Sequence, residues 1–222
     1  MKNQKTLLRT ACLALIVTLL ATAALCLAGC GKEPTKVDMT EIAKEINSLK
    51  TTDFEESSST TEYVRITVKN HGDIVLRLRE DIAPETVKNF RKLVSEKFYD
   101  GLTFHRIIPG FMIQGGDPKG NGTGSTTPVK GEMTGNGFEN NLTHIRGVLS
   151  MARRGGDYNS GSCQFFICNA DASHLNGEYA SFGYVVAGME TVDSISAVAT
   201  NAANNAPTES VVMEKVCFVK QK

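Results

Sequence analysis

Residues 104–117 read Phe-His-Arg-Ile-Ile-Pro-Gly-Phe-Met-Ile-Gln-Gly-Gly-Asp. It places one cation, Arg106, beside the apolar residues Phe111 and Met112 and the amide of Gln114. A Pro-Gly dipeptide and a Gly-Gly dipeptide allow sharp changes of chain direction around the group. An arginine beside apolar residues is usually a packed stem with a solvated head. The role of Arg106 therefore has to be inferred from other parts of the sequence.

A second string downstream completes the pattern. It consists of Gly147-Val-Leu-Ser-Met-Ala152, a polar loop, and Gln164-Phe-Phe-Ile-Cys168. In this order, with a Gly-rich segment between them, the two strings resemble the cyclophilin family of peptidyl-prolyl cis/trans isomerases. The resemblance covers roughly residues 63 to 219, nearly all of the globular part. It implies a mainly β fold, a closed eight-stranded antiparallel barrel capped by two helices.

Hydrophobic patterns agree with many short strands and few helices. Residues 64–68 and 74–78 alternate apolar and polar side chains around a Gly-containing turn, which is typical of a half-buried hairpin. Pro84 can open a helix, and an apolar stripe follows it. Further strands are expected over 103–108, 148–152, 164–168 and 211–219, and a second helix over 189–197. Short strands with Gly-rich turns are typical of a closed antiparallel sheet.

Charge and composition argue against a nucleic-acid partner. The chain has 222 residues, and without residues 1–29 it has 21 basic against 24 acidic residues, a net charge of −3. A nucleic-acid-binding domain would need a basic face. The Gly-rich residues 115–137 match neither the dinucleotide fingerprint nor the P-loop, so we expect a long ordered loop there.

The first 29 residues have the organisation of a signal peptide. Three basic residues precede an apolar run from Ala11 to Leu27, and the run is long enough that an uncleaved membrane span is the alternative. Leu27-Ala28-Gly29-Cys30 resembles a bacterial lipobox, which implies cleavage before Cys30 and acylation of its thiol, with palmitate as a typical chain. Two acyl chains suffice for stable anchoring. We therefore expect an extracytoplasmic lipoprotein attached to the cell membrane.

Three segments are predicted. Residues 1–29 are the lipoprotein signal peptide, 30–61 the lipidated N-terminus and a flexible linker, and 62–222 the isomerase domain. Residues 37–50 carry only a narrow apolar stripe, which favours a short or transient helix over a docked one. Residues 55–61 are acidic and rich in Ser and Thr, as linkers are. A tether of this length would reach roughly 30 Å.

The resemblance assigns catalysis to Arg106. Rotation about an X–Pro bond is slow because amide resonance sets a barrier of about 20 kcal/mol. Twisting the amide frees the lone pair of the prolyl nitrogen, which can then accept a hydrogen bond. A guanidinium aimed at that nitrogen therefore stabilises the twisted state selectively. No bond breaks, and we expect neither a metal nor an organic cofactor.

By the same resemblance, substrate-binding residues surround this arginine. Gln114 is expected to orient it and to contact the substrate backbone, and the backbone of Ala152 and Arg153 to bind an extended peptide. The proline pocket and its rim are assigned to Phe111, Met112, Gln164, Phe166, His174, Leu175 and Tyr179. Alternation supports part of this, since Gln164 and Phe166 share one face of the expected strand while Phe165 points to the other.

Three departures from familiar eukaryotic members matter. His174 stands where many carry Trp, which predicts weak rather than tight cyclosporin binding. Tyr179 stands where many carry His, and a ring with a polar tip can still line the pocket. The loop between Ala152 and Gln164 is two residues longer, and we predict that its Arg154 favours acidic side chains two residues before the proline.

Cysteine and histidine positions suggest no further chemistry. Two of the six cysteines lie in the signal peptide and Cys30 is the lipidation site, which leaves Cys163, Cys168 and Cys217. Cys163 and Cys168 would lie roughly 16 Å apart on one strand and cannot bridge. Either could pair with Cys217, or all three could be small buried hydrophobes. The four histidines lack metal-ligand spacing, so no metal site is expected.

The predicted function is isomerisation of proline-containing polypeptides, assisting the folding of exported or surface proteins. The alternative is a lipid-anchored peptide-binding or chaperone module whose isomerase activity is incidental. The complete set of expected catalytic and pocket residues favours the enzyme, and removal of the Arg106 side chain discriminates between the two.

Overall fold

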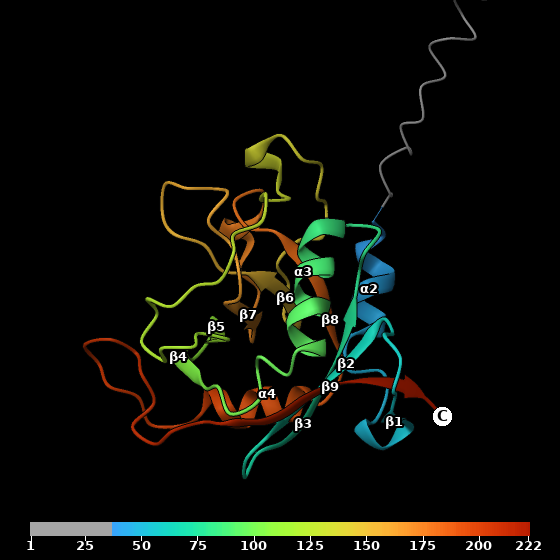
Figure 1. Cartoon of the computed structure of the whole chain (residues 1–222), viewed down its shortest axis with the longest axis vertical. Coiled ribbons are helices and arrows are strands. Elements are labelled where there is room, and N and C mark those ends of the chain that lie inside the picture. Colours follow the sequence, from blue (N-terminus) through green and yellow to red (C-terminus); the bar gives the residue numbers. More distant parts are fainter. Residues whose placement is uncertain (1–36) are drawn as a thin grey trace, which may run out of the picture. The chain divides into compact units, whose positions relative to one another are not determined.

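The computed structural model describes residues 37–222, which fold mainly as β-structure (Figure 1). One antiparallel sheet has the strand order β1-β9-β2-β3-β8-β6-β7-β5-β4. Its strands are β1 Phe54–Glu56, β2 Tyr63–Val68, β3 Gly72–Leu78, β4 Phe104–Ile108, β5 Met112–Gly115, β6 Val148–Met151, β7 Phe165–Cys168, β8 Ser181–Ala187 and β9 Met213–Gln221. The described α-helices are α2 Met39–Glu45, α3 Pro84–Ser95 and α4 Met189–Ser196.

Local sequence patterns predicted most of these elements. The β2–β3 hairpin pairs Val68 with Gly72 at its turn, and alternate β2 side chains are buried. Pro84 is the first residue of α3, where its missing N–H costs no hydrogen bond. Phe90 on the buried stripe of α3 packs edge-on against Phe165 of β7, with ring centroids 5.5 Å apart. The hairpin, the start of α3 and both ends of α4 are therefore confirmed within one or two residues, whereas strands β5 and β8 were not predicted.

The prediction of a closed eight-stranded barrel was wrong. The sheet has nine strands, and β1 and β4 are its edges. The start of β4 meets β9 only at an isolated bridge between Thr103 and Val212. Further along β4, the Ile107 N–H donates to the carbonyl of Asn205, which belongs to a loop. No ladder forms between β4 and β9, because a loop replaces the strand that would have to continue the pairing.

Residues 37–56 are not the flexible linker that we predicted. The Asp38 side chain caps the first turn of α2 by accepting the backbone N–H of Thr40 at 2.9 Å. Ile42 of α2 is only 3% exposed. Beyond the helix, Asn47 N–H donates to the carbonyl of Val185 on β8, and residues 54–56 then form edge strand β1. This segment therefore adds one helix, α2, and one strand, β1, to the two helices and eight strands that we expected.

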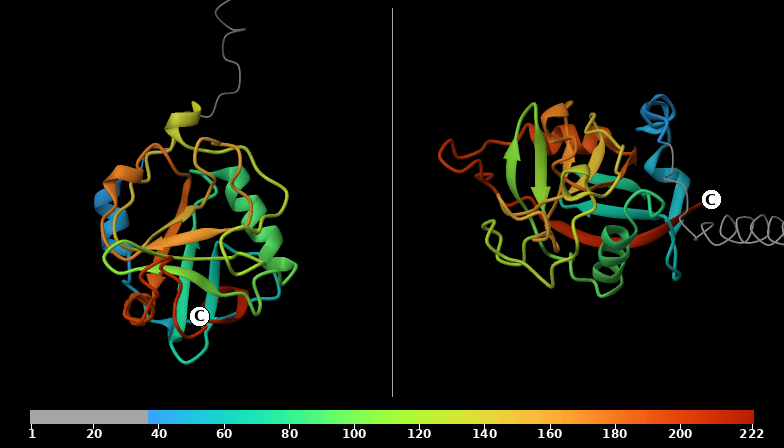
Figure 2. Two further views of the ribbon diagram at one scale, coloured as in Figure 1. Left: turned by 90° about the vertical axis from the view of Figure 1, so that its left-hand side faces the viewer. Right: turned by 90° about the horizontal axis from the view of Figure 1, so that it is seen from above.

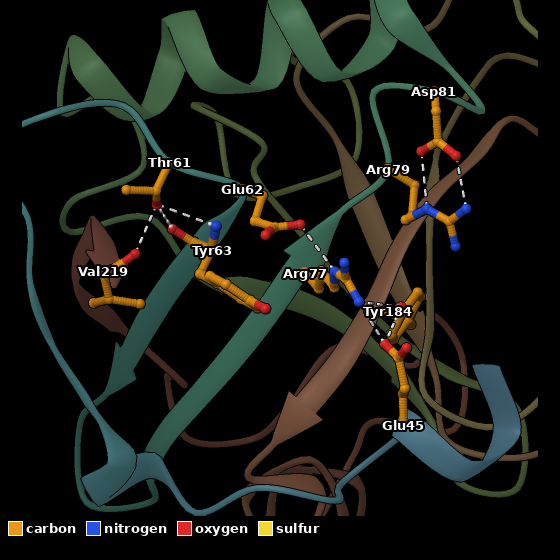
Figure 3. Close-up of polar contacts among 9 residues, drawn as sticks. All are labelled: Glu45, Thr61, Glu62, Tyr63, Arg77, Arg79, Asp81, Tyr184 and Val219. Carbon is orange, nitrogen blue, oxygen red and sulfur yellow. Dashed lines mark hydrogen bonds and ion pairs between the residues drawn. The ribbon is translucent and has the colours of Figure 1, made fainter. Parts of the chain in front are cut away.

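The physical reason for this docking lies in β8. Every residue of β8 is buried, so both faces of the strand need a covering layer. The segment from α2 to β1 covers one of them. Figure 3 shows the polar side chains at the edge of this contact and the hydrogen bonds that they form. Glu45 accepts hydrogen bonds from the hydroxyl of Tyr184 at 2.5 Å and from Arg77 at 2.7 Å, and Arg77 also donates to Glu62 at 2.9 Å.

Several predictions lie outside the described residues, namely the signal peptide, the alternative membrane span and lipidation at Cys30. Among residues 37–222, no helix combines the length and the apolar character needed to cross a membrane. Cys163, Cys168 and Cys217 are free thiols, with the first two buried. The open question of a disulfide to Cys217 is thereby answered for the folded chain.

Candidate active site

A row of paired residues crosses four strands at one end of the sheet. Arg106 of β4 lies opposite Gln114 of β5, Gln114 lies opposite Phe166 of β7, and Phe166 lies opposite Ser150 of β6. Directly opposed residues on neighbouring strands present their side chains on the same face. The strand register therefore gathers the expected catalytic arginine, its orienting amide and a pocket ring into one row.

This row forms part of the wall of a hollow of about 190 Å³. Its floor is apolar, and it consists of the buried side chains of Met112, Phe166 and Leu175. Half-buried Arg106 and Gln114 form its polar side. The complete lining consists of Arg106, Phe111, Met112, Gln114, Ala152, Arg153, Phe166, Leu175 and Tyr179. A proline ring is a chemically suitable occupant of such an apolar hollow with one polar side.

A relay of amides holds Arg106 in place. The Nη1 atom of Arg106 donates to Oε1 of Gln114 at 3.1 Å, and Nε2 of Gln114 donates to Oε1 of Gln164 at 2.9 Å. Nε2 of Gln164 then donates to the backbone carbonyl of Gly124 at 2.8 Å. The guanidinium is thus oriented before any ligand arrives, which reduces the cost of aiming it at a substrate.

The Gly-rich loop that ends this relay is ordered by Asp117. The buried carboxylate accepts backbone N–H groups of Lys119 at 2.8 Å and Asn121 at 3.0 Å, and also that of Gly122. Burial alone would raise the pKa of Asp117, but these N–H donors outweigh it and the pKa lies below its ordinary value. A Cβ atom on Gly124 would lie 1.9 Å from Oδ1 of Asp117, so only glycine fits there.

Sequence reasoning missed a polar cluster beneath the pocket. Buried His144 lies stacked on Phe166, with ring centroids 6.0 Å apart. Its Nε2 is 3.0 Å from the hydroxyl of Ser150, and its Nδ1 is 3.1 Å from Oδ1 of Asn176. Burial lowers the pKa of His144 to about 4, so the ring is neutral near pH 7. The one available signal was a serine within the otherwise apolar string 148–151.

A second hollow of about 390 Å³ adjoins the first. Gln114, Ala152 and Arg153 line both hollows. The lining of the second has no carboxylate, and the side chain of Arg154 at its rim is 78% exposed. The nearest acid to that guanidinium is Asp157, 3.4 Å away. This hollow therefore has a mixed polar and apolar lining and an accessible positive charge.

Most of the predicted site residues lie together. Nine of them line the first hollow, and Gln164 lines the second. His174 is the exception, because it is exposed and lines neither hollow. Its ring lies beside Phe111, with centroids 5.3 Å apart. Within the described residues, no group of three or more His, Cys, Asp or Glu side chains is arranged to hold a metal ion.

Comparison with family models identifies residues 63–217 as a match to the cyclophilin type peptidyl-prolyl cis-trans isomerase/CLD family. The matched range contains both hollows and leaves out α2 and β1. The docked N-terminal segment is thus an addition to the part of the chain that the family model describes.

Individual proteins similar to this chain are also named peptidyl-prolyl cis-trans isomerases. Peptidyl-prolyl cis-trans isomerase B of Bacillus subtilis (strain 168) is 48% identical over 130 residues, which cover 58% of this chain and 87% of the relative. The protein of the same name from Escherichia coli (strain K12) is 43% identical, covering 66% of this chain and 94% of the relative. A Cryptosporidium parvum cyclophilin type isomerase, crystallised in the presence of the dipeptide Ala-Pro, superposes with a TM-score of 0.65 at 32% identity, covering 70% of this chain and 98% of that one.

Proposed function

The chain belongs to the cyclophilin-type peptidyl-prolyl cis-trans isomerases, and from this premise we propose that it acts on exported or surface polypeptides through Arg106. The observation that carries the mechanism is the position of this arginine, held by Gln114 beside an apolar hollow. The hollow takes the proline ring, and the guanidinium faces the prolyl nitrogen.

Catalysis in this proposal comes from selective stabilisation of the twisted amide. In the planar amide the nitrogen lone pair is delocalised and accepts a hydrogen bond poorly. In the twisted amide the lone pair is localised, and Arg106 donates to it. Because the guanidinium remains charged throughout, no proton transfer is required. Each 1.36 kcal/mol of differential stabilisation corresponds to about a tenfold higher rate.

The substrate chain lies across both hollows. The proline occupies the first, against Phe166 and Leu175, and the backbone of Ala152 and Arg153 binds the extended peptide. The residue two positions before the proline enters the second hollow, where Arg154 favours an acidic side chain. The exposed position of His174 in place of an indole supports the proposal that cyclosporin binds weakly.

We also propose that the enzyme is anchored to the outer side of the cytoplasmic membrane. The sequence Leu27-Ala28-Gly29-Cys30 supports cleavage before Cys30 and attachment of acyl chains, palmitate among them, to its thiol. The isomerase domain would then lie outside the cytoplasmic membrane. Its clients there are proline-containing polypeptides that have just been exported or are displayed on the surface.

The decisive experiment compares the full chain with its Arg106→Ala variant in a protease-coupled proline-peptide assay. We expect kcat/KM to fall by roughly 100-fold or more, equivalent to about 2.7 kcal/mol of transition-state stabilisation. Arg91→Ala is the control, because the half-buried Arg91 is ion-paired with Glu80 and lines neither hollow. Equal turnover by Arg106→Ala and wild type would refute the mechanism.

The same assay tests the acidic preference with peptides that carry Glu or Lys two residues before the proline. A higher kcat/KM for the Glu peptide is expected, and equal values would refute the role of Arg154. The chaperone alternative predicts a different result for clients, since a binding module would retain client binding and cellular function in Arg106→Ala.

A further inference from the structure

Two consecutive arginines at the border of the hollows have opposite environments. The side chain of Arg154 is 78% exposed, whereas that of Arg153 is 8% exposed. Arg153 also lines both hollows, so it lies at the border between them. A buried guanidinium at this place requires a dense set of partners, and these partners indicate its role.

The partners of Arg153 are two aromatic rings, one acidic residue and the backbone carbonyl of Arg154, to which Nη1 donates at 3.1 Å. The central guanidinium carbon lies 4.6 Å from the ring centroid of Tyr158 and 4.7 Å from that of Tyr179. Nε donates to the backbone carbonyl of Glu178 at 2.8 Å, and Nη2 donates to its carboxylate at 3.1 Å. The Tyr158 hydroxyl donates to the same carboxylate at 3.1 Å. The planar guanidinium is thereby fixed both in position and in tilt.

Tyr179 depends on these contacts for its orientation. Its ring lines the first hollow and packs edge-on against Phe166, with centroids 5.7 Å apart. Among residues 37–222 its hydroxyl has no hydrogen-bond partner that would fix the ring from the other end. The contact with the guanidinium of Arg153 is therefore the second support of a ring that is only half-buried.

We propose that Arg153 is a positioning residue of the isomerase, which holds the Tyr179 ring in place as one wall of the proline pocket. The proposal rests on the proposed function to the extent that the first hollow binds proline. It gives the side chain of Arg153 a role in addition to the backbone contact expected from the sequence. Loss of the guanidinium frees the Tyr179 ring, so the pocket must be ordered again each time a substrate binds.

A double-mutant cycle in the full chain tests this coupling. We compare wild type, Arg153→Met, Tyr179→Leu and the double variant by kcat and KM for one proline peptide. Arg153→Met is expected to lower kcat/KM by about 3- to 10-fold, mainly through a higher KM. In the Tyr179→Leu background the same change should have almost no further effect. Arg153→Lys should recover little activity, because an ammonium ion pairs with Glu178 but does not stack as a plane.

A merely structural role would give a different pattern. Arg91→Met removes an ion-paired guanidinium elsewhere, and it should leave kcat and KM unchanged. If Arg153 only stabilised the fold, its loss would lower the thermal midpoint and would change kcat/KM equally in both Tyr179 backgrounds. That result, or wild-type kinetics for Arg153→Met, would overturn the proposal. The milder Glu178→Gln variant repeats the test if Arg153→Met does not fold.

The ring itself can be observed directly. The chain has five tyrosines and no tryptophan, so selectively labelled tyrosine rings give a simple NMR spectrum. We expect Arg153→Met to shift and sharpen the Tyr179 ring signals, whereas Arg91→Met should not. An inactive wild type would contradict the proposed function. An active wild type that loses activity in Arg106→Ala, but shows additive Arg153 and Tyr179 effects, would contradict only the present inference.

Discussion

At the scale of single residues, His144 links the packing of the pocket floor to pH. The buried ring stacks on Phe166, and its two nitrogens form hydrogen bonds with Ser150 and Asn176. Burial lowers the pKa of His144 to about 4. An unfolded chain protonates the same histidine near pH 6.5. Between these two pH values the unfolded state binds more protons than the folded state, so the free energy of unfolding rises with pH.

We therefore expect His144 to cost the protein stability as the pH falls from about 6.5 to about 4, by roughly 2–3 kcal/mol in the free energy of unfolding. Above pH 6.5 the histidine is neutral in both the folded and the unfolded state, so this cost is absent. Urea unfolding at several pH values measures it, with His144→Gln as the reference because glutamine keeps hydrogen-bonding groups but does not titrate. Parallel pH curves for wild type and His144→Gln would show that the histidine remains accessible to protons.

At the scale of elements, the segment from α2 to β1 shows how an apparent linker becomes part of a domain. Its apolar stripe is narrow, and nothing in its own pattern demands burial. β8 is buried over its whole length, however, and α2 covers it through Ile42 while Glu45 bonds to Tyr184 and Arg77 (Figure 3). The docked helix is thus explained by its partner strand rather than by its own sequence.

Ile42→Ala tests whether α2 unfolds together with the sheet. We expect it to lower the free energy of unfolding by about 2–4 kcal/mol, because it removes a buried side chain from a packed contact. Lys44→Ala on the exposed side of the same helix is the matched control, with a change below about 0.5 kcal/mol. Isomerase activity of the folded variants should equal that of wild type. Identical denaturation curves for Ile42→Ala and wild type would mean that α2 is not docked in solution.

At the scale of the whole molecule, α2 and the strands β4 and β5 lie at opposite ends of the folded unit (Figure 1). Both Figure 1 and the view from above in Figure 2 show α2 at one end and β4 and β5 at the other. Cys30 and Met39, the first residue of α2, are nine positions apart, and nine fully extended residues span at most about 32 Å. A lipid anchor at Cys30 would therefore hold the domain close to the membrane, with the proline pocket on the side away from α2.

Cys30→Ser tests this arrangement. The variant should leave the membrane fraction and appear in the soluble extracytoplasmic fraction, because it has no thiol to acylate. Its kcat/KM for a small soluble peptide should agree with that of the membrane-bound wild type within about twofold, since the pocket is open to solvent in both. Retention of Cys30→Ser in the membrane would favour an uncleaved span, and a large difference in activity would indicate that the membrane obstructs the pocket.

The amino-acid sequence by itself determined most of the strands around the site and most of the residues that line it, although strand β5, which carries Gln114, was not predicted. Alternation is a local property, so Phe165 in the core and Phe166 in the pocket could be assigned to opposite faces before any pairing was known. The β2–β3 hairpin and the start of α3 could be predicted equally well, because a turn and a proline at the first helical position act within a few residues.

Only the tertiary structure decided the contacts that join distant segments. The open edge at β4 depends on a loop near Asn205, and the docking of α2 depends on the uncovered face of β8. The contact of Arg153 with Tyr179 likewise joins two loops that have no common local pattern. The physical reason is the same in each case: burial and pairing free energies belong to both partners at once, and a sequence window contains only one of them.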